Sequence, residues 1–171
     1  MKKNNRGFTL TELVVVIGII GVLISIATIS MAGYVKRTKL RTALYEIDGD
    51  VRQSRWIAKS RGTECYLQFD PATSSYTLNG VDRHILPAGV RFGIDPSVIG
   101  CPGEPSRRPP LDGITFGTSR HPNTLIYYPT GDIVPAGTIY ITDGRQTMAV
   151  RVARLGRPKL WRSEGGVWSA M

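Results

Sequence analysis

Glu12 is the acidic side chain that raises the first chemical question, because it stands at the start of a long apolar run. No charged residue occurs from Leu13 to Val35. An unpaired carboxylate is costly in hydrocarbon, so Glu12 is expected to need a partner or to stay near the membrane interface. Nearby backbone N–H groups would serve as partners inside one chain, and an ammonium group of a second chain would serve between chains. The alternative left open is an interfacial carboxylate with no partner role.

A second group of chemistry-bearing side chains is basic and lies near the C-terminus. From Arg145 onward, six cationic residues stand against one acid, Glu164, in a chain of formal charge +9. Cations neutralise phosphates and an indole stacks on a base, so DNA is a candidate ligand for this segment. The alternative is a solvated basic edge that deters pairing between sheets. The candidate DNA-binding residues surround Trp161 and are Arg154, Arg157, Lys159 and Arg162.

The remaining reactive residues favour no catalytic or metal chemistry. His84 and His121 are isolated in the sequence, outside any nucleophile or metal-ligand motif, and no cofactor-binding turn occurs. Cys65 and Cys101 lack the close spacing to further ligands that a zinc site needs. A disulfide between them is a candidate if the domain lies outside the cytoplasm, and two free thiols are the alternative. We expect no enzyme, no cofactor and no metal.

The apolar run from residue 13 to residue 35 must position Glu12, and its length suits a membrane-spanning helix. Basic residues flank it on both sides, so loop charge alone leaves its orientation ambiguous. Three interpretations compete. The run is a signal anchor, or a signal peptide cut after Ser30-Met31-Ala32, or an anchor whose short basic leader is removed between Gly7 and Phe8.

The next segment, residues 36–62, continues as an amphipathic helix. Apolar residues recur at steps of three and four from Leu40 to Ala58, which predicts one stripe that packs on a sheet. Gly49 weakens the case for an unbroken helix, and Gly62 is the expected C-cap.

Residues 63–171 change to short β-type runs separated by turn residues. Asp143-Gly144-Arg145 predicts a hairpin turn, and five prolines within residues 95–112 predict a long irregular loop. The fold class predicted is α+β, with a long N-terminal hydrophobic helix whose second half packs on an antiparallel sheet domain. The expected strands are 64–69, 75–78, 90–94, 113–117, 124–128, 137–142 and 147–153.

The stretch GFTLTELVVVIGIIGVLISIA, which begins at Gly7, resembles the processing site and stalk of type IV prepilins. The resemblance implies a leader of residues 1–7, cleavage after Gly7 by a prepilin peptidase and methylation of the Phe8 amine. It implies a transmembrane and filament-core helix over residues 8–35, in which Glu12 meets the Phe8 ammonium of a neighbouring pilin. Many pilins have a mid-stalk proline, and none occurs here before Gly62.

The second half is similar to the FimT/GspH group of minor pilins and pseudopilins. The resemblance lies in VRQSRWIAKSRGTECYLQFD and in IYYPTGDIVPAGTIYITDGRQTMAVRVARLGRPK. It implies a subunit of a type II secretion pseudopilus or a type IV pilus, held in the bacterial inner membrane with its globular domain in the periplasm, and at a filament tip after assembly. Some members bind DNA through a Gly-Arg-x-Arg element, which Gly156-Arg157-Pro158-Lys159 matches only in part.

Overall fold

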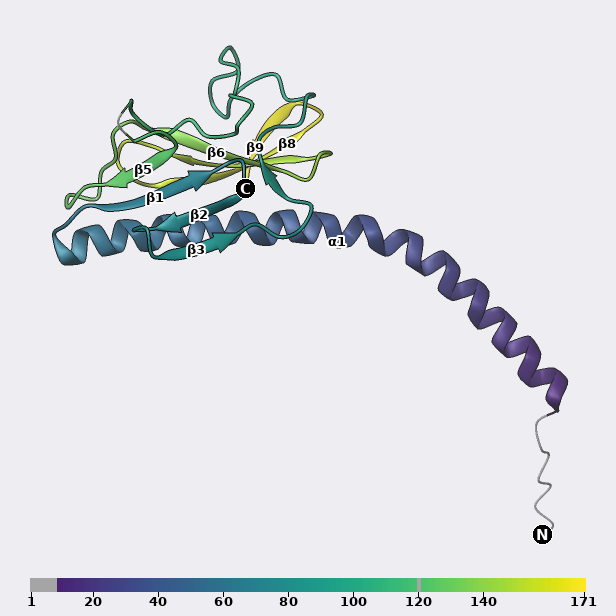
Figure 1. Ribbon diagram of the computed structural model, residues 1–171. Coiled ribbons are helices and arrows are strands. Elements are labelled where there is room, and N and C mark those ends of the chain that lie inside the picture. Colours follow the sequence, from purple (N-terminus) through teal and green to yellow (C-terminus); the bar gives the residue numbers. More distant parts are fainter. Residues whose placement is uncertain (1–8, 120) are drawn as a thin grey trace, which may run out of the picture. The chain divides into compact units, whose positions relative to one another are not determined.

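The computed structural model describes residues 9–119 and 121–171, without the side chains of residues 26–32. The chain forms two compact units, Met1–Lys36 and Arg37–Met171. One helix, α1 (Leu10–Arg61), belongs to both, and nine strands follow it (Figure 1). The α+β prediction is confirmed, with two antiparallel sheets where one was expected.

Within the first unit, α1 exposes apolar side chains on all sides. Leu13, Val14, Val15 and Val16 are all exposed, although successive residues point about 100° apart around the helix. No helix among the described residues is both long enough and apolar enough to cross a bilayer. Residues 26–32, inside the predicted span, lie outside that search.

The second unit begins with the C-terminal half of α1, which ends where it was expected to end. The helix runs through Gly49 without a break, and Gly62 follows its last residue with a φ of +65°. A positive φ at this position is the usual way in which a helix is stopped by glycine.

Four strands form the first sheet, in the order β3-β2-β1-β5, and every neighbouring pair is antiparallel. Its strands are β1 (Cys65–Asp70), β2 (Ser75–Leu78), β3 (Asp82–Ile85) and β5 (Thr124–Tyr127). Five strands form the second sheet, in the order β4-β6-β7-β8-β9, which is also antiparallel. Its strands are β4 (Arg91–Phe92), β6 (Gly137–Thr142), β7 (Thr147–Val152), β8 (Pro158–Glu164) and β9 (Val167–Ala170).

The main core joins the helix to both sheets. The predicted apolar stripe is buried as expected, and Leu40, Leu44 and Val51 are fully covered. These helix residues share one cluster with first-sheet residues such as Leu67 and second-sheet residues such as Ile141. Figure 1 shows this half of α1 running alongside β1, β2 and β3.

A smaller apolar cluster covers the opposite face of the second sheet. Because neighbouring residues of a strand face opposite ways, Tyr140 points away from the main core into which Ile139 and Ile141 point. Cys101, from the irregular loop, packs on Tyr140 and Ala149 in this second cluster. The loop predicted over residues 95–112 is therefore real and serves as a cover for the sheet.

One strand expected in this unit is absent. Residues 113–117 form no strand, and only isolated bridges join Ile114 to Ile139 and Gly117 to Pro122. Of the two alternatives left open for the cysteines, the structure has the free thiols: Cys65 is buried in the main core and Cys101 in the second cluster, so the candidate disulfide is not formed. Three strands were also missed: β3, β8 and β9.

Candidate functional sites: the start of the helix and a basic groove

The first candidate site is the start of α1, where Glu12 is paired within its own turn. The Thr9 backbone N–H and Thr9 Oγ1 each donate to Glu12 Oε2 at 3.0 Å, and the Glu12 N–H donates to Thr9 Oγ1 at 3.2 Å. This reciprocal pair is a capping box, which satisfies N–H groups that a helix start leaves without partners. Gly7 and Phe8, the predicted processing residues, lie outside the described residues.

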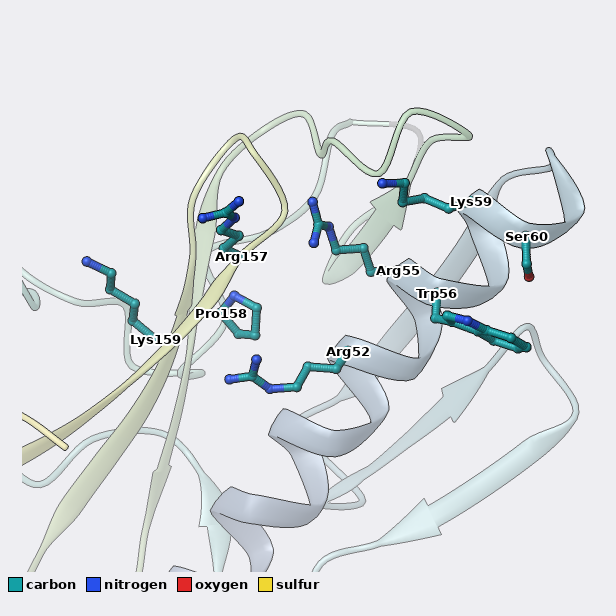
Figure 2. Close-up of a pocket in the computed structure, with 8 residues that line it drawn as sticks. All are labelled: Arg52, Arg55, Trp56, Lys59, Ser60, Arg157, Pro158 and Lys159. Atoms are coloured by element: carbon teal, nitrogen blue, oxygen red, sulfur yellow. The ribbon is translucent and has the colours of Figure 1, made fainter.

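The second candidate site is a basic groove of about 820 Å³ between α1 and the start of β8. Two of the predicted DNA-binding residues, Arg157 and Lys159, line it from β8 and the turn before it. Figure 2 shows Arg52 and Arg55 pointing from the helix toward Arg157 and Pro158. The full lining consists of Arg52, Arg55, Trp56, Lys59, Ser60, Arg157, Pro158 and Lys159.

Arg55 joins the two walls of the groove. Its guanidinium donates from Nε to the Gly131 carbonyl at 3.0 Å and from Nη2 to the Leu155 carbonyl at 3.2 Å. The Tyr127 hydroxyl donates to the Gly156 carbonyl at 2.9 Å in a buried position, which holds the turn before β8 from beneath. The Leu155 bond joins the turn that carries Arg157 to the helix, the Gly156 bond joins it to β5, and the Gly131 bond joins the loop after β5 to the helix.

Gly156 allows the turn before β8 to lie close to Gly131 and to the Tyr127 ring. Its φ is +71°, and a Cβ built there would overlap the Gly131 carbonyl oxygen and lie 2.8 Å from the Tyr127 ring. Only glycine combines such a φ with so little room. The Gly-Arg pair singled out in the sequence therefore has a structural reason for its glycine.

The charges of the groove are mostly uncompensated. Arg52 donates from Nε to Asp48 Oδ2 at 2.8 Å, and this hydrogen bond raises the pKa of the Arg52 guanidinium further above its already high value. Within the described part of the chain, no ion pair joins Lys59, Arg157 or Lys159 to an acid. None of the described lining residues is acidic.

The other two predicted DNA-binding residues lie outside the groove. Arg162 is half-buried on β8, where it pairs with Glu164 at 3.0 Å. Arg154 is exposed in the turn between β7 and β8, and its carbonyl accepts a hydrogen bond from the Ile133 N–H.

The helix residues of the groove were missed in the sequence, although their spacing was visible there. Arg52, Arg55, Trp56 and Lys59 follow one another at steps of three, one and three, which places them on one helix face. Its basic and aromatic composition is the signal that could have found it.

The histidines form no catalytic arrangement with their described neighbours. The His84 ring stacks on Tyr76 at 5.1 Å, and its Nδ1 lies 3.7 Å from Asp50 Oδ2. His121 lies at an exposed turn. The described residues contain no cluster of His, Cys, Asp or Glu that could hold a metal ion.

A family model described as the prokaryotic N-terminal methylation motif matches residues 2–28, a minor part of the chain. Among solved structures, the type IV minor pilin FimU of Pseudomonas aeruginosa is similar over 80% of this chain and 96% of its own. Its sequence identity is 12% and its TM-score is 0.51. The minor pseudopilin EpsH from the Type 2 Secretion System of Vibrio cholerae is 10% identical over 78% of this chain and 96% of its own, with a TM-score of 0.48. No curated protein sequence matches the chain.

The motif and the fold agree with each other and with the resemblance noted in the sequence. The match to the methylation motif, over residues 2–28, includes Gly7, Phe8, Glu12 and the first apolar turns of α1. The similarity to FimU establishes the shared fold, a long helix followed by antiparallel sheets. The chain therefore combines a prokaryotic N-terminal methylation motif with the fold of the minor pilin FimU.

Proposed function

We propose that the chain is a minor pilin or pseudopilin, a non-catalytic structural subunit of a type IV pilus or a type II secretion pseudopilus. The single observation that carries this proposal is the methylation motif at the head of a helix that leads into a minor-pilin fold. Residues 13–35 hold the precursor in the bacterial inner membrane, and the globular domain lies in the periplasm. A prepilin peptidase cuts after Gly7 and methylates Phe8.

The capping box supports a specific role for Glu12 in this proposal. Because Oε2 accepts both Thr9 bonds, the carboxylate is held at the helix start, and Oε1 accepts no hydrogen bond from the described residues. In a filament, the Phe8 ammonium of a neighbouring subunit approaches this carboxylate. Such a pair is strongest where water is excluded, so it favours assembly and sets the register between subunits.

Sequencing of the mature N-terminus tests the processing step. We expect a chain that starts at methylated Phe8, and an unprocessed chain in a strain without the prepilin peptidase. A start at Gly33 would contradict the proposal and support ordinary export by a signal peptide.

Two substitutions at Glu12 separate the charge from the cap. Glu12→Ala removes both, whereas Glu12→Gln keeps a side chain that completes a capping box but carries no charge. If the charge pairs with a neighbour, both variants enter filaments less than one tenth as often as the wild type, as measured by immunoblotting of sheared filaments. Normal incorporation of Glu12→Gln would show that capping alone matters, and normal incorporation of both would remove Glu12 from assembly.

We propose DNA binding as a second candidate function, because the structure adds a helix wall to the basic segment. Lys59, Arg157 and Lys159 lack an acidic partner in the described chain, and they line the same groove. Such a concentration of like charge is repulsive in the free protein and is relieved when phosphates bind. The partial match to Gly-Arg-x-Arg, with Lys159 in the last place, supports the same ligand.

The test is a charge-matched pair of double variants in the full chain in nonionic detergent. Arg157→Ala/Lys159→Ala should weaken DNA binding and lower the slope of log Kd against log salt by about 1 to 2. The slope falls because each phosphate contact that is removed means about one counterion fewer released when DNA binds. Lys39→Ala/Arg145→Ala removes two exposed cations outside the groove and should leave the slope nearly unchanged. Equal effects in both pairs, or no binding by the wild type at low salt, would exclude this function.

A further inference from the structure

Trp56 is the groove residue that cation chemistry leaves unexplained. Its side chain is 68% exposed, whereas Trp161 and Trp168 pack partly buried against the second cluster. A large aromatic surface that is left in water is costly unless a ligand covers it. Trp56 thus marks a place where something apolar and flat is expected to bind.

The position of Trp56 relative to the cations is informative. Arg55 and Trp56 lie at opposite borders of one helix face, about 100° apart, with Arg52 and Lys59 between them. Figure 2 shows the Trp56 ring beside Ser60, on the flank of the helix away from Arg157 and Lys159. A ligand that uses both features must pass across the helix, with its charges near the turn and its flat group near Trp56.

We propose that the groove binds single-stranded DNA across α1, with phosphates on Lys59, Arg157 and Lys159 and an unpaired base stacked on Trp56. This inference rests on the second candidate function and narrows it to a strand type and a stacking residue. Base stacking on an aromatic side chain tolerates any sequence, because every base has a π face.

Two competing ligands explain less of the geometry. A duplex keeps its bases stacked inside, so it would use the cations and leave Trp56 uncovered. An acidic polypeptide would satisfy the cations, but it would cover Trp56 only where one of its own aromatic side chains lies at the matching distance. A single strand bends sharply enough to cross the helix and supplies both phosphates and free bases.

The structure also indicates which groove residues can be changed without damage to the fold. Arg55 holds the turn before β8, so it is unsuitable as a probe of ligand contact. Trp56 lies outside both apolar clusters, so its replacement is not expected to disturb the core. Trp56→Phe keeps a smaller stacking ring, and Trp56→Ala removes the ring.

The experiment measures fluorescence anisotropy of labelled oligonucleotides with the full chain in nonionic detergent. The probes are a dodecamer single strand of mixed sequence and the same dodecamer as a duplex. We expect tighter binding of the single strand and, for Trp56→Ala, a loss of about tenfold in single-strand affinity, from stacking of one base. Trp56→Phe should recover most of that loss, and duplex affinity should be unchanged in both variants.

The outcomes separate this inference from the function on which it rests. If the wild type binds the duplex as tightly as the single strand, or if Trp56→Ala lowers both affinities equally, the inference is overturned while DNA binding stands. If neither probe binds at low salt, both fail. Displacement of the single strand by polyglutamate at equal charge concentration would also overturn it, because a ligand without bases would then suffice.

Discussion

Tyr76 shows how one polar side chain fastens the first sheet to the helix. Its hydroxyl donates to Asp50 Oδ2 at 2.5 Å, and its ring packs on Phe69 and on His84. Burial raises the pKa of the Tyr76 phenol well above its ordinary value of 10.0, and the hydrogen bond to Asp50 raises it further. The fold therefore favours the neutral phenol.

The pH dependence that follows can be isolated by Tyr76→Phe. A raised pKa contributes stability that is complete below pH 10 and is lost as the pH rises through the folded-state pKa. We expect the free energy of unfolding of the variant to be lower than that of the wild type by about 1 to 2 kcal/mol at pH 7. This difference in free energy should become smaller above pH 10. Urea unfolding at pH 7, 9 and 11 measures it. Tyr127 and Tyr140 have raised pKa values in the wild type and in the variant, so their contributions to the pH dependence cancel. A difference in free energy of unfolding that grows with pH would contradict the role given to Tyr76.

Gly156 and Gly144 form a matched pair of left-handed glycines. Gly144 has a φ of +84° and open space where a Cβ would be, whereas Gly156 has a φ of +71° and crowded surroundings. Gly144→Ala should cost about 1 kcal/mol, the ordinary strain of that conformation. Gly156→Ala should cost roughly 2 kcal/mol or more, because the turn before β8 must move away from Gly131. Equal losses in thermal unfolding would mean that the turn adapts freely.

At the scale of elements, the pattern of apolar residues predicted the buried strands well and the exposed strands poorly. The strands β6 and β7 are buried on both faces, since the main core covers one face and the irregular loop the other. The residues of β3 are all exposed, so nothing in their composition distinguishes them from a loop, and only pairing with β2 makes them a strand.

The hairpin of β8 and β9 could have been predicted. Gly165-Gly166 joins them with φ values of +59° and +85°, and a Gly-Gly pair is a recognised hairpin turn. The strand predicted over residues 113–117 is the opposite case, a strand that was expected and is not formed. Gly113 and Gly117 both have positive φ, which interrupts an apolar segment that otherwise resembles a strand.

The irregular loop is held on the second sheet by Arg151, and this contact can be tested through Cys101. Arg151 Nη2 donates to Glu104 Oε1 at 2.6 Å, and Arg151 Nη1 donates to the Pro102 carbonyl. Loss of these charge-assisted bonds should let the loop open more often. In Arg151→Ala we expect Cys101 to react with a thiol reagent about tenfold faster, which corresponds to roughly 1.4 kcal/mol of opening free energy.

The chain supplies two controls for this measurement. Cys65, in the main core, should remain unreactive in the same sample, which distinguishes loop opening from unfolding. Arg107→Ala removes only an exposed contact to Glu104 at 3.7 Å and should leave the rate unchanged. Equal labelling of Cys101 in the wild type and Arg151→Ala, measured by mass spectrometry, would mean that Arg151 does not hold the loop.

At the scale of the whole molecule, the site residues divided into those that local patterns reveal and those that only folding brings together. The site at the start of α1 could be predicted because Glu12 and the apolar run are adjacent in the sequence. The basic groove was not, because it combines a helix face around Arg52 with Arg157, more than a hundred residues later. The turn before β8, which is held by Arg55 and Tyr127, places Arg157 beside this helix face. Such long-range contacts leave no local pattern in the sequence.

The division into two units predicts which part of the chain can fold without a membrane or detergent. Both apolar clusters lie entirely within Arg37–Met171, whereas the described apolar residues of Met1–Lys36 are exposed. Stability comes mainly from buried apolar area, so a fragment of residues 37–171 should fold in water. A helix that begins at residue 37 would lose only the hydrogen bonds of its new first turn.

We expect this fragment to be monomeric in buffer and to melt cooperatively within about 5 °C of the same domain in the detergent-solubilised full chain, because no core residue has been removed. Circular dichroism and sedimentation measure both properties. Leu44→Ala in the fragment should lower the free energy of unfolding by about 2 to 5 kcal/mol, since Leu44 is fully buried between the helix and the sheets. A fragment that is unfolded or aggregated at low concentration would mean that residues before Arg37 contribute to the core, contrary to the boundary between the units.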